Sequence, residues 1–133
     1  MKVRAIIEKG SEMYGIRSDD VIGRCCLVGF GDTVEEARED FMVSIEEAIE
    51  DADEAGLKHP SSDEIKVTFT YDLPSFFNYF DIINTSKFAA YVGVNESKMR
   101  QYKSGLAFPG EKTTKKILAA IKKIGAELSR VAL

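Results

Sequence analysis

Strand-like alternation of apolar and polar residues is confined to the first 72 residues of this 133-residue chain, and it does not return after Asp72-Leu73-Pro74. In that first part, short strands are predicted at residues 2–8, 13–17, 24–30 and 65–71. After the proline, helices are predicted at residues 74–83, 86–92, 96–103 and 111–131. The pattern predicts an α+β domain over residues 1–72, followed by a small all-α domain over residues 73–133.

A long helix is predicted between the third and fourth strands. Thr33 and Glu36 have the spacing of a capping box, and Gly56 supplies a stop. The apolar residues between them recur at helical intervals, at Val34, Ala37, Phe41, Ile45, Ala48 and Ala52. The predicted order of elements is β-β-β-α-β. We expect the helix to pack this apolar stripe against one face of the sheet.

The third strand is continuously apolar from Cys25 to Phe30, a pattern typical of a strand whose two faces are both at least partly covered. Gly29 and Gly31 are interpreted as turn glycines. The adjacent Cys25 and Cys26 form neither a CxxC metal half-site nor a disulfide framework.

The charges divide unevenly between the two parts of the chain. Residues 1–80 hold 8 basic and 18 acidic residues, a balance of −10, whereas residues 81–133 hold 10 basic and 4 acidic residues, a balance of +6. This asymmetry predicts two surfaces with different partners, of which the basic one suits a polyanion. No apolar run approaches the roughly 20 residues of a bilayer span, so we expect a cytoplasmic protein with no membrane partner.

Residues 85–103 have the spacing of a helix-turn-helix. Ala89 is small where two helices would cross, Gly93 permits a left-handed backbone at the turn, and Asn95 is placed to cap the second helix. The apolar wedge between the helices is predicted to comprise Phe88, Val92, Val94, Met99 and Tyr102. Short helix pairs with a glycine turn also occur as plain core structure, and the basic balance of this segment favours DNA binding over that alternative.

In a helix-turn-helix the second helix enters the major groove, with its N-terminal residues against base edges. The candidate DNA-binding residues are Ser86, Asn95, Glu96, Ser97, Lys98, Arg100, Gln101 and Lys103. Arg100 or Lys98 suits guanine and Gln101 suits adenine, but spacing does not separate base contacts from phosphate contacts. The last helix carries a stripe at Ile117, Ile121, Ile124, Leu128 and Val131, which suits either a coiled-coil seam or packing within its own domain.

Two segments together resemble a family, the HicB antitoxins. The stretch Gly31-Asp32-Thr33-Val34-Glu35-Glu36-Ala37 looks like the start of their helix, and the segment from Asp72 to Gly105 looks like the DNA-binding tail of some members. The resemblance implies an incomplete RNase H-like N-terminal domain, a C-terminal helix-turn-helix, and dimers or larger homo-oligomers. It also implies repression through double-stranded operator DNA and neutralisation of a HicA-type ribonuclease toxin.

The acidic helix face gives a physical reason for a toxin partner, because a ribonuclease that grips RNA is basic. The candidate toxin-binding residues are Glu39, Glu46, Glu50 and Glu54. Many family members have a Pro-Gly element where this chain has Cys26–Phe30, so an orphan DNA-binding regulator, whose N-terminal domain serves only oligomerisation, is the alternative.

Catalysis is not expected. The first strand offers no aspartate, only Glu8 near its end, and Asp72 alone does not build a two-metal site. No catalytic residue, metal site or cofactor is therefore predicted.

Overall fold

The computed structural model describes residues 1–133 and divides into two compact units, Met1–Phe76 and Phe77–Leu133. Because residues 77–80 carry no charge, the balances of −10 and +6 are also those of the two units. The chain has an α+β fold with one four-stranded mixed sheet and five α-helices, as expected for its class.

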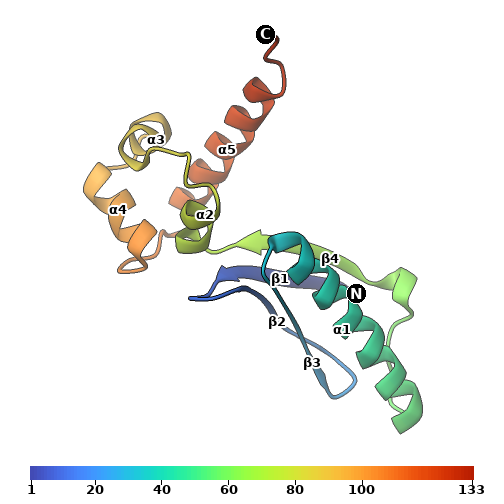
Figure 1. Cartoon of the computed structure of the whole chain (residues 1–133). Coiled ribbons are helices and arrows are strands. Elements are labelled where there is room, and N and C mark those ends of the chain that lie inside the picture. The colour runs from blue at the N-terminus through green and yellow to red at the C-terminus, as the bar shows by residue number, and fades with distance from the viewer. The chain divides into compact units, whose positions relative to one another are not determined.

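The first unit follows the predicted order β-β-β-α-β (Figure 1). Its elements are β1 (Lys2–Lys9), β2 (Tyr14–Ile22), β3 (Cys25–Gly31), α1 (Val34–Ala55), a 3₁₀ turn (Ser62–Glu64) and β4 (Lys66–Tyr71). The strands lie in the order β3-β2-β1-β4. Neighbours among β1, β2 and β3 are antiparallel, whereas β4 is parallel to β1, so α1 carries the chain across the sheet from one edge to the other.

Helix α1 covers one face of this sheet. All six residues of the predicted stripe are buried, and Phe41 meets Phe69 of β4 edge to face with ring centroids 5.9 Å apart. On the sheet side, the buried residues include Val3, Ala5 and Ile7 of β1. Thr33 caps the helix by accepting from the Glu36 amide, and Gly56 ends it with a φ of 69°. The capping and the stop predicted from the sequence are both confirmed.

The two faces of β3 are covered unequally. Burial alternates along the strand: Leu27 and Gly29 face α1, whereas Val28 and Phe30 on the other face are only partly covered, with 42% and 55% of each residue exposed. The interpretation of Gly29 as a turn residue is wrong. This glycine lies within β3, where a Cβ would stand only 2.4 Å from the backbone nitrogen of Phe41, so glycine is what allows α1 to approach this closely.

Strand β2 is longer than predicted, because it continues past Arg17 to Ile22 through an irregularity in its pairing with β3. Polar side chains stabilise this segment: Ser18 Oγ accepts from the Asp20 amide, and Asp20 Oδ2 accepts from the Arg4 amide of β1 at 3.1 Å. The polar residues beyond the predicted end of this strand are therefore held in the sheet by their own side chains.

The remaining helices are α2 (Leu73–Tyr79), α3 (Thr85–Val92), α4 (Glu96–Ser104) and α5 (Glu111–Leu128). Asp72 Oδ1 accepts from the Ser75 amide at 2.7 Å, which caps α2, and α2 ends four residues earlier than predicted. In the second unit, Phe77 and Phe88 pack edge to face, with ring centroids 5.8 Å apart. The buried residues of this unit are Phe77, Phe88, Ala89, Val92, Met99, Tyr102, Ile117 and Ala120.

Candidate nucleic-acid interface

The turn between α3 and α4 is fixed by backbone geometry. Gly93 has a φ of 85°, a left-handed conformation that strains any residue with a Cβ, and the amides of Gly93 and Val94 both donate to the Ala89 carbonyl at 2.9 Å. The Asn95 side chain then accepts from the Lys98 amide at 3.2 Å and caps α4. The roles predicted for Gly93 and Asn95 in the turn are confirmed.

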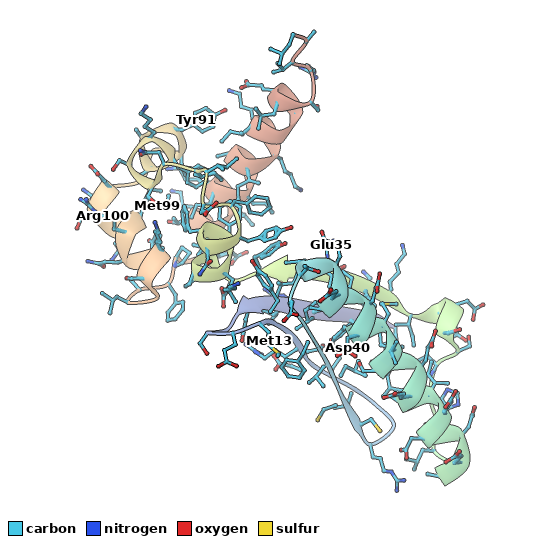
Figure 2. The ribbon with its side chains drawn as sticks, in the orientation of Figure 1. Met13, Glu35, Asp40, Tyr91, Met99 and Arg100 are labelled. Atoms are coloured by element: carbon cyan, nitrogen blue, oxygen red, sulfur yellow. The ribbon has the colours of Figure 1, made fainter.

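Met99 and Tyr102 set the orientation of α4. Both are buried, together with Phe88, Ala89 and Val92 of α3, whereas Val94 is only half-buried. Figure 2 shows Met99 on the inner side of α4 and Arg100 projecting from the helix on the opposite side. Because the two inward residues lie on one stripe, the remaining positions of α4 face outward.

The structure leaves every predicted DNA-binding residue exposed on the surface of its unit: Ser86, Asn95, Glu96, Ser97, Lys98, Arg100, Gln101 and Lys103. Helical spacing places Ser97, Arg100 and Gln101 at the centre of the outward face of α4, with Lys98 and Lys103 on its two flanks. Asn95 sits at the start of the helix, where its side-chain oxygen is already engaged as the cap.

Glu96 links the two helices and also engages Arg100. Its Oε1 accepts from Ser86 Oγ at the start of α3 and lies 3.5 Å from Nη1 of Arg100, one turn along α4. The Arg100 side chain is 62% exposed, and an ion pair this exposed contributes about 0–1 kcal/mol. The Glu96 carboxylate therefore positions Arg100 but binds it only weakly. An anion that binds the guanidinium more tightly can displace this carboxylate.

One residue of this surface, Ser104, is absent from the predicted DNA-binding residues, and another, Lys116, comes from a different helix. Ser104 follows Ser97, Arg100 and Gln101 at the i, i+3, i+4, i+7 spacing of one helix face, a signal that was present in the sequence. Lys116 of α5 places its Nζ 3.8 Å from the position that a Cβ on Gly93 would take. No sequence pattern connects Lys116 to the turn, because only the packing of α5 brings it there.

Two rows of acidic residues run along α1. Glu36, Asp40 and Asp51 form the first row and are used within the fold: they accept from the Asp32 amide, the Phe30 amide and the Arg24 guanidinium at 2.8–2.9 Å. Asp53 lies outside both rows and contacts His59. The hydrogen bond from Arg24 lowers the pKa of the Asp51 carboxyl below its ordinary value. The second row is exposed and makes no hydrogen bond or ion pair within the protein; it contains the candidate toxin-binding residues Glu39, Glu46, Glu50 and Glu54.

The acidic groups of the chain do not gather into a metal site. No group of three or more His, Cys, Asp and Glu side chains is placed to hold a metal ion. Asp72, the residue weighed for hydrolysis, caps α2, and the only histidine, His59, contacts the Asp53 carboxylate and the Pro60 carbonyl. No helix has the length and apolar character needed to cross a membrane.

Comparisons of the chain with protein-family models, with curated proteins and with solved structures found no match.

Proposed function

We propose that this protein is a transcriptional repressor of the HicB antitoxin type, in which α3 and α4 form a helix-turn-helix and the first unit is an incomplete RNase H-like domain. The proposal rests on the outward face of α4, which is polar and exposed. This face belongs to a unit whose net charge is +6. A cytoplasmic dimer on double-stranded operator DNA is the form in which such a protein acts.

DNA recognition would use the exposed residues at the centre of that face, which are Ser97, Arg100 and Gln101. Arg100 has the geometry for a bidentate contact with guanine O6 and N7, and Gln101 suits adenine N6 and N7. Lys98 and Lys103 on the flanks would neutralise phosphates and release counterions, which makes binding weaker at high salt. When Arg100 moves to the DNA, Glu96 keeps its contact with Ser86 and so maintains the angle between α3 and α4.

The test is a gel shift with the DNA upstream of the protein's own gene and with random DNA of equal length. Arg100→Ala and Gln101→Ala should each cost roughly 1–3 kcal/mol on the operator and much less on random DNA. Lys58→Ala, an exposed lysine of the first unit, is the control and should bind as the wild type does. Equal losses on both DNAs would reduce Arg100 and Gln101 to phosphate contacts.

The exposed acidic row of α1 supports the second part of the proposal, binding of a basic ribonuclease toxin. The carboxylates of Glu39, Glu46, Glu50 and Glu54 make no hydrogen bond or ion pair within the chain. A basic protein can therefore pair with them without disrupting contacts that stabilise the fold. Glu46→Lys with Glu50→Lys should reduce co-purification of a small basic protein encoded beside this one. The same charge change at Glu12 and Asp19, both exposed in the first unit, is the control.

The orphan regulator remains the alternative within this proposal. It corresponds to operator binding that is lost in Arg100→Ala, together with no toxin recovered by the wild-type protein.

A further inference from the structure

Glu96 is the only acidic residue between Asp81 and Glu111, and it lies at the start of α4, the helix that enters the major groove in the proposed function. Its side chain is 47% exposed. The phosphates on either side of a DNA groove repel a carboxylate in this place, so it lowers affinity for duplex DNA unless it meets a hydrogen-bond donor there. The major-groove edges of the bases offer two such donors, the amino groups N4 of cytosine and N6 of adenine.

One oxygen of the Glu96 carboxylate is engaged and the other is free. Oε1 accepts from Ser86 Oγ and lies 3.5 Å from Nη1 of Arg100, whereas Oε2 makes no hydrogen bond or ion pair within the chain. The bond from Ser86 keeps the carboxylate beside the arginine. Glu96 and Arg100 therefore present an anionic acceptor and a cationic donor side by side on the surface of the second unit.

A G·C base pair has the matching pattern at its major-groove edge. Guanine offers the acceptors N7 and O6, and cytosine offers the donor N4. Guanine O6 and cytosine N4 are hydrogen-bonded to each other and so lie about 3 Å apart. This spacing is close to the 3.5 Å between the Glu96 oxygen and the Arg100 nitrogen, so the two side chains can face the two groups at once.

We propose that Glu96 and Arg100 together read a single G·C pair of the operator, with Arg100 donating to guanine N7 and O6 and Glu96 Oε2 accepting from cytosine N4. This inference rests on the proposed function and adds to it a specificity-determining residue and the base that it reads. At an A·T pair in the same orientation, Arg100 would face adenine N6 and Glu96 would face thymine O4, and both contacts would be repulsive. Glu96 thus contributes to specificity by rejecting a wrong base pair as well as by binding the right one.

The first test identifies the base pair that each side chain reads. Duplexes are selected from a randomised library with the full-length wild type and with Arg100→Ala, Glu96→Ala and Gln101→Ala. Arg100→Ala and Glu96→Ala should lose selection at the same G·C pair, and Gln101→Ala, the matched control on the same helix, should lose it at a different pair. Selection lost at two different pairs in Arg100→Ala and Glu96→Ala would overturn the inference. A wild type that enriches no sequence would overturn the proposed function, and the inference with it.

The second test alters single groups of that base pair in the selected duplex. N4-methylcytosine still pairs with guanine, but its methyl group replaces the hydrogen that faces the major groove. This change should weaken binding of the wild type about five- to tenfold and leave binding of Glu96→Ala unchanged. Replacing guanine by 7-deazaguanine, which lacks N7, should weaken binding of the wild type but not of Arg100→Ala.

Ser86→Ala separates base reading from a purely structural role of Glu96. This variant removes the bond between α3 and α4 but keeps the carboxylate, so its binding should still fall by a similar factor when the cytosine carries the N4-methyl group. Equal binding of the methylated and unmodified duplexes by the wild type, or a methyl effect of the same size in Glu96→Ala, would show that Glu96 only links the two helices.

Discussion

Gly29→Ala should separate α1 from β3 and destabilise the first unit. The added Cβ would stand 2.4 Å from the Phe41 nitrogen and 2.5 Å from the Ala37 oxygen, whereas ordinary contacts begin near 3.4 Å. The helix must therefore retreat by about 1 Å, and because both atoms belong to its backbone, no side chain can rotate away. Overpacking of this kind costs about 1–3 kcal/mol, and the rigid contact favours the upper end.

That cost is large for a unit of this size. A 76-residue unit is stable by roughly 4–11 kcal/mol, so a loss of about 3 kcal/mol should lower its Tm by roughly 12–24 °C. Hydrogen-exchange mass spectrometry reports each unit separately, and peptides from β3 and α1 should lose protection while those from α4 keep theirs. Gly15→Ala in β2 is the control, because its Cβ would meet only the Phe30 ring at 3.4 Å. Equal protection in the two variants would refute the reasoning.

Three further predictions concern single side chains. Asn95→Ala removes the cap of α4 and should lower the stability of the second unit by about 1 kcal/mol, measured by urea unfolding followed by hydrogen exchange in α4 peptides. Glu96→Gln removes the charge that faces Arg100 and should tighten binding to random DNA, so an unchanged dissociation constant would show that the pair does not restrain the arginine. His59 has a pKa raised by its bond to the Pro60 carbonyl and by Asp53, so its stabilising effect is complete below about pH 6.5 and is lost as the pH rises through the raised value. Urea midpoints of the first unit should fall more between pH 6 and 8 in the wild type than in His59→Gln, and parallel curves would contradict this assignment.

The sequence predicted the features that depend on local periodicity and capping. These features are the six-residue stripe of α1, its stop at Gly56, and the caps at Thr33 and Asn95. Each of them depends on residues that lie close together in the chain. Each is a local interaction, so a single sequence contains all the information that it needs.

The features that the sequence did not predict depend on which element lies beside which. The apolar run of β3 gives no sign of which face is the more exposed, because that depends on α1 packing on only one face of the sheet, which leaves Val28 and Phe30 partly exposed on the other. Gly29 reads as a turn residue until α1 is seen against it. At the candidate interface, the six exposed positions within α4 followed from its periodicity, whereas Lys116 reaches the turn only through the packing of α5.

The bond between Asp40 and the Phe30 amide has a consequence for how the protein behaves when it is concentrated. An edge strand with apolar side chains is a template for unwanted strand addition, which leads to fibres and precipitates. Here the Asp40 carboxylate already accepts from the Phe30 amide, a donor that an added strand would need for pairing. It also places a negative charge beside the exposed edge of the sheet. Helix α1 thus protects the edge of β3 from strand addition, and it also covers one face of the sheet.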